Sequence, residues 1–346
     1  MKWKNNNDII NVHKISINGH MLDRGVVLKD DVKRQLIKIA KYYYNDGLTQ
    51  EEIAKRMSLS RQKISRLIQR LIPEGIVTIH IDDSLDSYLA LEQGLEEKFN
   101  LKEVVVVSTE ENNHMTLDNI GRAGAEYLDR ILKHDDIIGI AWGRTLTYVS
   151  QHIVKERSNL NLSMVQLAGG VFPYGHFFNG ELSKQSGEIT REISLKLGAK
   201  PYLMNNPLVV DNIATKQVLL HESTISNIFN MAKTCTIAIV SIGSLGNNIS
   251  PFVEGALTEE DLQYLLEKKA VGNFVFRYFD IDGNIIEAPF YDRLLCPELE
   301  PLKEIPLKIC VSGTKEKVDA IFGGIRGGFV DVLVTDSETA TALMKK

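Results

Sequence analysis

The chain has 346 residues, of which 44% are hydrophobic and 25% are charged, and its formal net charge at pH 7 is -5. This length and composition are typical of a globular protein with two or three domains and a sizeable buried core. No apolar run approaches the roughly 18 residues that a membrane helix requires, and the start of the chain lacks the apolar stretch of a secretory signal. We therefore expect a cytoplasmic protein with no membrane partner.

The charges are distributed unevenly along the chain. Residues 31–81 hold 10 Lys and Arg against 5 Asp and Glu, a net charge of +5, so the remainder of the chain carries -10. A small basic module joined to an acidic body is typical of a nucleic-acid-binding domain attached to a domain with another task.

Residues 1–30 begin with an Asn-rich stretch and show no sustained hydrophobic period. We interpret them as an N-terminal extension that can be disordered. Helical spacing begins at Asp31 and continues through Leu36 and Ile39 to the turn signal NDG at residues 45–47. A first helix is therefore predicted from Asp31 to this turn.

Two further helices joined by a tight turn are predicted over residues 49–72. Thr49 and Glu52 have the spacing of a capping box, in which the Thr hydroxyl and the Glu carboxylate satisfy each other's backbone amides. Ser60 is a second candidate N-cap, and the helix that follows it ends before the next proline. The alternating run IVTIHI at residues 76–81 predicts a short strand that can form a wing beside the helices.

The last of these helices predicts a DNA-reading surface. Its apolar residues form one stripe at helical spacing, and the opposite face is entirely polar and basic. A helix in the DNA major groove needs short polar and guanidinium side chains outward, with Lys or Arg at the phosphates. The predicted base contacts are Arg61, Gln62, Ser65 and Arg66. The predicted phosphate contacts are Lys55, Lys63, Gln69 and Arg70, and Thr49, Gln50 and Ser60 at the helix starts complete the set. The alternative is an ordinary helical hairpin whose polar face meets water.

The rest of the chain predicts an α/β fold. Apolar side chains at helical spacing indicate a helical linker over residues 82–100, which can also self-associate. Beyond it, short β-branched runs alternate with amphipathic stretches. The runs are VVVVS at 104, DIIGIAW at 136, MVQLAGG at 164, IAIVSIG at 237, KICVSG at 308 and VDVLVTD at 330. Such runs predict a parallel sheet covered on both faces, in a Rossmann-like domain over residues 101–346.

The cysteines and histidines give no pattern for a metal site. The three cysteines lie far apart without a CxxC pair, and the eight histidines show neither HxxxH nor HExxH spacing. No GxSxG, Walker or GxGxxG element is present either. We therefore expect no metal ion, no disulfide framework and no cofactor.

Residues 39–81, IAKYYYNDGLTQEEIAKRMSLSRQKISRLIQRLIPEGIVTIHI, resemble the helix-turn-helix of the SorC/DeoR-type bacterial regulators that respond to sugar phosphates. The promoter-reading module of sigma factors looks similar, so the later segments narrow the choice. Those segments, which resemble the effector domain of the same family, are IGIAWGRTLTYV, GELSKQSGEITREISLKLGA, AVGNFVFRYFDIDG and VDAIFGGIRGGFVDVLVTDSETATALM. The resemblance implies a winged helix-turn-helix domain over residues 31–81 and a sugar-phosphate-isomerase-like effector domain. It also implies a homo-oligomer, a dimer or tetramer, on double-stranded operator DNA.

The loop WGRTLT at residues 142–147 follows a predicted strand and opens a predicted helix, so its amides and the helix dipole can hold an anion. Gly143 lets the backbone approach closely, Thr145 and Thr147 offer hydroxyl donors, and Arg144 adds a cation. Taken alone, a turn of this composition is more often structural. The resemblance implies that the loop holds the phosphate of a phosphorylated sugar and that Lys317 also contacts this effector.

Further effector contacts are predicted along the same sheet edge. Gln166, Gly169 and Gly170 end a predicted strand where open α/β sheets place their ligands. Asp280, in the segment that matches the family's FD-x-x-G pattern, accepts sugar hydroxyls on one interpretation and caps its own turn on the other. Glu188 is interpreted as a solvated or capping carboxylate outside the site. Three residues depart from the family pattern and could retune the sugar pocket: Ser241, Asn273 and Thr314 stand where Gly, Asp and Gly are usual.

We predict a DNA-binding transcriptional regulator, not an enzyme, that represses a carbohydrate-catabolic operon and whose operator binding changes when a phosphorylated sugar binds. Relief of repression is the expected sign, and activation stays open. One alternative is an enzyme like the sugar-phosphate isomerases and aminosugar deaminases with Asp280 as base, but no histidine falls in a segment beside it, and a fold confers no chemistry. The other alternative, a sigma-like DNA-binding protein without an effector, leaves the α/β domain unexplained.

Overall fold

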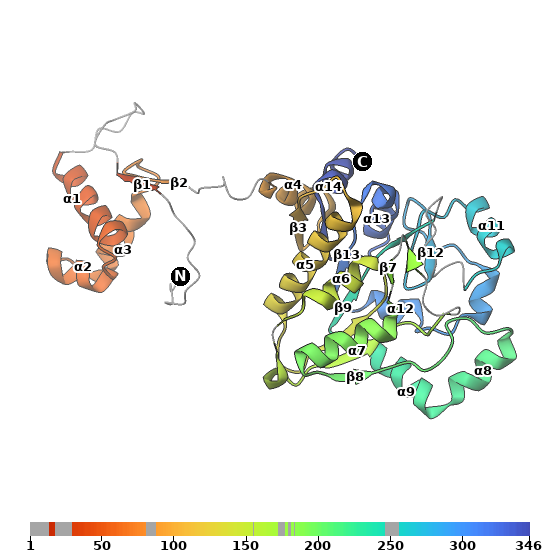
Figure 1. Cartoon of the computed structure of the whole chain (residues 1–346). Helices are drawn as coiled ribbons and strands as arrows, with labels where there is room; N and C mark the ends of the chain where they lie inside the picture. Colours follow the sequence, from red (N-terminus) through yellow and green to blue (C-terminus); the bar gives the residue numbers. More distant parts are fainter. Residues whose placement is uncertain are drawn as a thin grey trace. The chain divides into compact units, whose positions relative to one another are not determined.

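The computed structural model describes residues 14–17, 30–80, 88–154, 156–171, 177–178, 181–182, 184–245 and 256–346. The chain forms two compact units, residues 1–87 and residues 88–346, which are called here the N-terminal and the C-terminal unit (Figure 1).

The described residues of the N-terminal unit form three α-helices, a π-helical turn and a two-stranded sheet. Its elements are α1 (Asp30–Ala40), a π-helical turn η1 (Lys41–Asn45), α2 (Gln50–Met57), α3 (Arg61–Arg70), β1 (Lys14–Ile17) and β2 (Val77–His80). The three predicted helices and the predicted wing strand are therefore present. The pairing partner of the wing was not predicted: β1, which pairs antiparallel with β2, comes from within the N-terminal extension. Apart from residues 14–17 and residue 30, that extension lies outside the described residues.

Side-chain caps define the two helices of the helix-turn-helix. The Thr49 hydroxyl accepts a hydrogen bond from the Glu52 amide at 3.3 Å, and a Glu52 carboxylate oxygen accepts one from the Thr49 amide at 2.8 Å, so the predicted capping box is present. The Ser60 hydroxyl accepts from the Lys63 amide at 3.2 Å and caps α3 in the same way. Between the two helices, Ser58 takes a left-handed conformation, with φ of 52°, which ends α2 and turns the chain.

The C-terminal unit is built on a seven-stranded sheet. Its strand order is β3-β14-β13-β9-β4-β5-β8, and every neighbouring pair is parallel. The strands are β3 (Glu103–Val107), β4 (Ile137–Ile140), β5 (Ser163–Gln166), β8 (Lys200–Tyr202), β9 (Ile237–Val240), β13 (Leu307–Val311) and β14 (Val332–Asp336). The six predicted runs form six of these strands. The seventh, β8, escaped prediction because it is a short edge strand that contains Pro201.

Helices connect the strands of this sheet. They are α4 (Leu89–Phe99), α5 (Asn113–Ile131), α6 (Arg144–His152), α7 (Ser186–Leu197), α8 (Ile213–His221), α9 (Ser223–Ala232), α11 (Glu259–Glu267), α12 (Leu299–Lys303), α13 (Val318–Arg326) and α14 (Ser337–Met344). The connections through α5, α6 and α7 advance along the sheet in one direction, and those through α9 and α13 return in the other. Because such crossovers are right-handed, the two sets cover opposite faces of the sheet, in agreement with the prediction.

Shorter elements complete the unit. A small antiparallel sheet consists of β10 (Gly243–Ser244), β11 (Gly272–Phe274) and β12 (Arg277–Phe279), and a two-stranded ladder of β6 (Phe177–Phe178) and β7 (Glu181–Leu182). Three 3-10 helices are η2 (Ser158–Leu160), η3 (Pro289–Arg293) and η4 (Lys315–Lys317). The turn η4 leads directly into α13 and so places its side chains beside the carboxyl end of β13.

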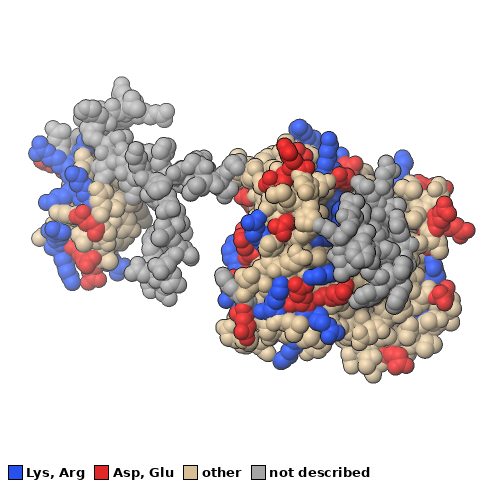
Figure 2. All heavy atoms as spheres, viewed as in Figure 1, with Lys and Arg blue, Asp and Glu red and all other residues tan. Residues whose placement is uncertain are grey.

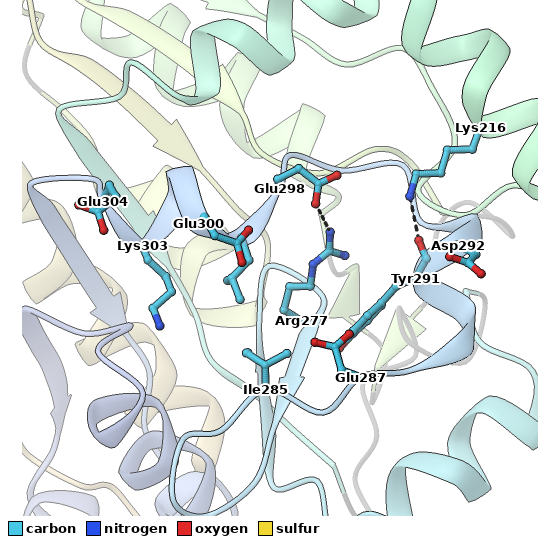
Figure 3. Close-up of a pocket in the computed structure, with 11 residues that line it drawn as sticks. Lys216, Arg277, Ile285, Glu287, Tyr291, Asp292, Glu298, Glu300, Lys303 and Glu304 are labelled. Atoms are coloured by element: carbon cyan, nitrogen blue, oxygen red, sulfur yellow. Dashed lines mark hydrogen bonds and ion pairs between the residues drawn. The ribbon is translucent and has the colours of Figure 1, made fainter.

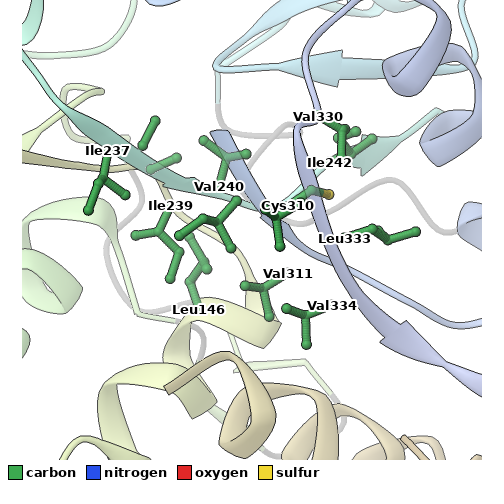
Figure 4. Packing of buried hydrophobic residues seen from close by; sticks show 14 of the residues in the cluster. Leu146, Ile237, Ile239, Val240, Ile242, Cys310, Val311, Val330, Leu333 and Val334 are labelled. Atoms are coloured by element: carbon green, nitrogen blue, oxygen red, sulfur yellow. The ribbon is translucent and has the colours of Figure 1, made fainter. Parts of the chain in front are cut away.

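The core of the C-terminal unit lies along the central strands (Figure 4). Ile239, Val311 and Val334 are each fully buried, and every residue of β9 and β14 is buried. Full burial of such a side chain contributes roughly 1.5–3 kcal/mol. The near-continuous apolar runs of the sequence are explained by this burial on both faces.

Helix α4 belongs to the C-terminal unit, although the sequence predicted it as part of a linker over residues 82–100. Leu95 is fully buried against the core, and two carboxylates of the helix bond to the edge strand β3. Glu96 accepts from the Val104 amide at 2.8 Å, and Glu92 accepts from the Val106 amide at 2.7 Å. The helix therefore covers backbone donors that an edge strand would otherwise expose, and the boundary moves from residue 100 to residue 87.

Candidate nucleic-acid interface and anion site

The outward face of α3 carries the predicted base contacts. Arg61, Gln62 and Arg66 are exposed, and Ser65 is half-buried beside them, while Ile64 and Leu67 on the opposite face are buried. Within residues 30–80, neither of the two arginines forms an ion pair with a carboxylate. Figure 2 shows Lys and Arg side chains along one border of the N-terminal unit, with acidic side chains among them. The geometry leaves the two guanidinium groups available to base edges or phosphates.

Some of the predicted phosphate contacts are exposed, and others already pair with a carboxylate. Lys63 and Gln69 are exposed. Arg70 instead pairs with Glu74 at 2.5 Å, and Lys55 lies 3.8 Å from Glu51. These two cations are already partly neutralised, so they are weaker candidates for phosphate contacts than Lys63.

The remaining predicted interface residues lie at the helix starts. The hydroxyls of Thr49 and Ser60 accept hydrogen bonds from the amides that they cap, and Gln50 is half-buried at the first position of α2. The tyrosines at residues 42–44 pack against the core of the N-terminal unit. The ring of Tyr42 also lies 4.8 Å from the guanidinium carbon of Arg56.

The candidate anion site lies where the strand order of the large sheet reverses. From β4 the chain continues outward to β5 and β8, whereas β9, on the other side of β4, leads to β13 and β14. Connections that diverge in this way leave a crevice at the carboxyl ends of the two central strands, and open α/β sheets bind their ligands there. Gly143 follows β4, Ser241 follows β9, and Ser312 follows β13, so the three residues gather at this point.

Gly143 sets the shape of the loop between β4 and α6. Its φ is 143°, and a Cβ atom on it would lie 2.7 Å from the Cβ of Ser241. Glycine is therefore required by conformation and by space. Because the N-cap of α6 is Gly143, the N-cap residue offers no side chain to the first amides of the helix. The amides at the start of α6 and the positive end of the helix dipole lie beside this crevice.

The two threonine hydroxyls predicted as anion donors are used inside the protein. Thr145 is fully buried, and its Oγ1 donates to the Val311 carbonyl oxygen at 2.5 Å. Thr147 donates to the Gly143 carbonyl oxygen at 3.3 Å. The prediction of hydroxyl donors is therefore corrected: both side chains fix the loop, and its backbone amides are the groups that can hold an anion.

Lys317 brings a cation to the same point. Its Nζ donates to Ser241 Oγ at 3.2 Å and to Ser312 Oγ at 3.3 Å, which leaves one of its three N–H donors for a ligand. No carboxylate of the described residues pairs with it. Burial, and then the nearby Arg144 guanidinium, lower the pKa of Lys317 to about 8. Two cations that destabilise one another's charge beside a helix N-terminus are the arrangement that an anionic ligand would stabilise.

Glu316 is an acidic group in this neighbourhood. A hydrogen bond from Thr314 is the first cause that lowers its pKa, and the Arg144 charge lowers it further. The charge of Arg144 therefore acts on both Glu316 and Lys317. The buried carboxylate of Asp336 also acts on Glu316 and raises its pKa, so the two cations of the site are matched by two carboxylates.

Thr314 adopts a backbone conformation that normally requires glycine. Its φ is 79° and its ψ is 147°, and its amide donates to the buried carboxylate of Asp336 at 2.7 Å. A non-glycine residue in this region costs about 1–3 kcal/mol and is found mainly at functional sites. This is one of the three positions where the sequence departs from the family pattern.

Gln166 and Gly170 line a second pocket on the same sheet edge, with a volume of about 690 Å³. The Gln166 side chain bonds to backbone groups: it accepts from the Met204 amide at 2.8 Å and donates to the Ala168 carbonyl oxygen at 2.5 Å. Gly169 packs against residues 206–207, where a Cβ atom would lie 2.6 Å from the Asn206 carbonyl oxygen. These residues shape the pocket wall, whereas their predicted role was direct contact with the ligand.

Asn206 also lines this second pocket, and it carries a buried polar atom that the sequence did not indicate. The residue is only 5% exposed, and its Oδ1 accepts no hydrogen bond from the described residues. A buried acceptor without a donor is costly, and a ligand hydroxyl would satisfy it. Arg191 and Glu188 also line the pocket, although Glu188 was left outside the predicted site.

Asp280 belongs neither to the anion site nor to the second pocket. One carboxylate oxygen accepts from the amides of Asp282 and Asn284 at 3.0 and 2.9 Å, and the other accepts from the Asn284 side chain at 3.2 Å. Of the two interpretations of this residue, the turn cap is the one that the structure contains. Its role as an acceptor of sugar hydroxyls stays a prediction.

Ser241, Ser312 and Asp336 complete the anion site and were not predicted as part of it. For Ser241 the sequence contained an indication, because the family usually carries glycine at this position. The other two had none, since they gain their roles from contacts across the sheet. In the part of the chain that the structure describes, no helix is long and apolar enough to cross a membrane, and no group of His, Cys, Asp and Glu is placed to hold a metal ion.

Comparison with known proteins assigns both units. Residues 83–345 match the family model of a sugar-binding domain, and residues 29–78 match a winged helix-turn-helix DNA-binding model. The deoxyribonucleoside regulator of Bacillus subtilis (strain 168) is 32% identical over 317 residues, which cover 91% of this chain and 99% of that protein. The sorbitol operon regulator of Klebsiella pneumoniae is 30% identical over the same shares of the two chains. The crystal structure of the full-length sorbitol operon regulator SorC from Klebsiella pneumoniae superposes with a TM-score of 0.69 at 29% identity, covering 91% of this chain and 100% of that one.

Proposed function

Because the chain belongs to the SorC/DeoR-type family of transcriptional regulators, with a helix-turn-helix and a sugar-binding domain, we propose that it represses carbohydrate-catabolic genes and leaves its operator when a phosphorylated sugar binds. Its relatives are regulators and not enzymes. The carboxylate that an isomerase-like reaction would have used, that of Asp280, is occupied by its own turn.

The observation that carries the phosphate assignment is the pair of cations at the N-terminus of α6. Lys317 bonds only to hydroxyls among the described residues, and Arg144 adds to the positive potential that lowers its pKa. A phosphate dianion would neutralise both cations and accept from the amides at the start of α6, where Gly143 allows close approach. An uncharged sugar offers neither interaction.

The sugar portion is assigned to the second pocket. Its wall contains Gln166 and Gly170, and the unpaired Oδ1 of Asn206 is an acceptor suited to a hydroxyl group. Hydroxyl donors that satisfy such buried acceptors discriminate strongly between sugars, because a sugar that lacks the hydroxyl leaves the acceptor unpaired.

Operator binding is assigned to α3. Arg61, Gln62, Ser65 and Arg66 are proposed to contact base edges, and Lys63 and Gln69 to contact phosphates. One such module is too small to be selective, so the working form is proposed to be a homo-oligomer, a dimer or tetramer, whose recognition helices meet half-sites separated by whole helical turns. Effector coupling of about 1–3 kcal/mol would change operator affinity by roughly 5- to 150-fold.

The test uses the full-length protein and calorimetric titration with pentose, hexose and ketose phosphates, each paired with the same sugar without phosphate. At least one phosphorylated sugar is expected to bind, and its partner without phosphate is expected to bind far more weakly. Replacement of Lys317 by Gln should weaken binding by about tenfold or more, because a charge-assisted hydrogen bond is lost. Lys315→Gln, which removes a charge from an exposed side chain two residues earlier, is the matched control and should leave affinity unchanged.

Operator binding is then measured by gel shift with and without the sugar phosphate that binds. Release of DNA at saturating sugar phosphate supports repression relieved by the effector, and tighter binding would reverse the sign. A panel without any binding phosphorylated sugar, or equal losses in the two lysine variants, would contradict the assignment of the phosphate site.

A further inference from the structure

A separate pocket of about 540 Å³ lies between β12, η3, α12 and α8 (Figure 3). Its α12 side adjoins the amino end of β13, since the Lys308 ammonium at the start of that strand donates to the Lys303 carbonyl oxygen at 3.1 Å. The proposed effector site lies at the carboxyl ends of the strands. This pocket is therefore not part of that site, and nothing in the proposed function uses it.

The floor of the pocket contains a buried guanidinium with a missing partner. Arg277 is only 6% exposed, and its guanidinium lies over the Tyr291 ring, 4.8 Å from the centroid. One terminal nitrogen is 3.4 Å from a Glu298 carboxylate oxygen, and the other is buried without an oxygen or nitrogen acceptor among the described residues. A buried donor of a charged group without a strong acceptor destabilises the folded protein. An acceptor from a bound molecule would remove this cost.

Glu298 is a weak ion-pair partner for the Arg277 guanidinium. Its side chain is 63% exposed, and the 3.4 Å contact is long compared with a charge-assisted hydrogen bond. The buried thiol of Cys296 also accepts a hydrogen bond from the Arg277 side chain, but a thiol is a weak acceptor. A ligand carboxylate that displaces Glu298 would pair with both terminal nitrogens in the bidentate geometry that arginine favours.

The charges around the pocket restrict what such a ligand can be. Five of the eleven lining residues are Asp or Glu, against three Lys or Arg. A simple anion would meet this acidic excess and be repelled. A simple cation would suit the rim but would leave the buried nitrogen of Arg277 without an acceptor. A molecule that carries both charges satisfies both conditions.

We propose that this pocket binds a small zwitterion of the amino-acid class, with its carboxylate on the Arg277 guanidinium and its ammonium between the rim carboxylates. Figure 3 shows Glu300 and Glu287 on two sides of Arg277, which places acceptors for an ammonium around the carboxylate position. The Lys216 ammonium is held at 2.9 Å by the Tyr291 carbonyl oxygen, and Lys303 lies over the Phe329 ring, so neither lysine is directed solely at the ligand. The regulator would thus take a second small-molecule input, independent of the sugar phosphate.

The test is calorimetric titration of the full-length protein with a panel of the free L-amino acids. For each amino acid that binds, the corresponding amine without carboxylate and the corresponding acid without ammonium are titrated as matched probes. The zwitterion is expected to bind at least tenfold more tightly than either probe. Absence of binding by every amino acid at millimolar concentration overturns the proposal, as does equal or tighter binding of the amine or the acid.

Substitutions in the pocket test whether the amino acid binds there. Arg277→Lys keeps the charge but loses the fork, and Glu287→Gln removes an exposed rim carboxylate; each should weaken amino-acid binding by about tenfold. Glu259→Gln, at an exposed position outside the pocket, is the control and should bind normally. The melting temperature of each variant without ligand reports whether it is folded, so a loss of binding in a folded Glu287→Gln variant supports the proposal even if Arg277→Lys is unstable. Normal binding in folded forms of both variants overturns it.

Discussion

Replacing Lys317 with arginine keeps the positive charge of this side chain and removes its titration from the pH range of the experiment. In the protein without ligand, burial and the neighbouring Arg144 lower the pKa of Lys317 to about 8. A phosphate group bound beside the ammonium would raise that pKa again, so binding takes up a proton whenever Lys317 is neutral beforehand. Affinity for the effector is therefore expected to fall as the pH rises through 8.

The magnitude follows from the fraction of protonated Lys317. With a pKa of about 8, this fraction is about 0.9 at pH 7 and about 0.1 at pH 9. If only the protonated form binds phosphate, affinity falls roughly tenfold between these two pH values. The effector itself contributes little to the change, because the second pKa of a phosphate monoester is about 6 and the dianion dominates throughout. Arginine stays protonated at both values, so the Lys317→Arg variant should lose the pH dependence.

The assay is calorimetry at pH 7, 8 and 9 in two buffers with different heats of ionisation, which yields the number of protons taken up per sugar phosphate. The expected uptake is about 0.1, 0.5 and 0.9 for the unmodified protein and close to zero for Lys317→Arg. Lys315→Arg, at the exposed neighbouring position, should behave as the unmodified protein does. Equal affinity at pH 7 and pH 9, or the same proton uptake in the Lys317→Arg variant, would refute the reasoning.

Three further predictions concern backbone strain, DNA reading and helix capping. Thr314→Gly should raise the free energy of unfolding by about 1 kcal/mol, because glycine adopts the φ of 79° without strain; thermal unfolding checks this, and a lower melting temperature would speak against strain. Arg66→Ala should weaken specific operator binding by about 1–3 kcal/mol and leave sugar-phosphate affinity intact, whereas Lys63→Ala should weaken binding to all DNA and reduce the salt slope by about 1; gel shifts at several salt concentrations distinguish the two. Thr49→Ala should destabilise α2 by about 0.5–2 kcal/mol through loss of the capping box, measured as faster amide hydrogen exchange in that helix, and unchanged exchange would contradict the role of the cap.

Helices and strands were predictable where the interactions that define them join residues close together in the sequence. The capping residues Thr49 and Ser60 act on amides three positions away, so spacing in the sequence was enough to place α2 and α3. The central strands were predictable because burial on both faces requires an apolar residue at nearly every position. Strand β8 has no such requirement at the edge of the sheet, and β1 pairs with a strand about sixty residues further along the chain.

The candidate site was predictable only in its backbone. The turn at Gly143 could be inferred from a strand that leads into a helix, but which hydroxyls face a ligand depends on the opposite side of the crevice. Thr145 bonds to Val311, which is far away in the sequence, and this contact removes its hydroxyl from the ligand. In the same way, the unpaired oxygen of Asn206 arises from the packing of three loops, and no pattern in the sequence indicates it.

The position of α4 determines how a change at the phosphate site can reach the polypeptide that leads to the N-terminal unit. The Thr314 amide bonds to Asp336 at the end of β14, β14 is paired with β3 along its length, and β3 is bonded to Glu92 and Glu96 of α4. These bonds form a continuous series of contacts from Thr314 through β14 and β3 to α4. Helix α4 is thereby bonded to β3, the strand that pairs with the one whose last residue Thr314 contacts.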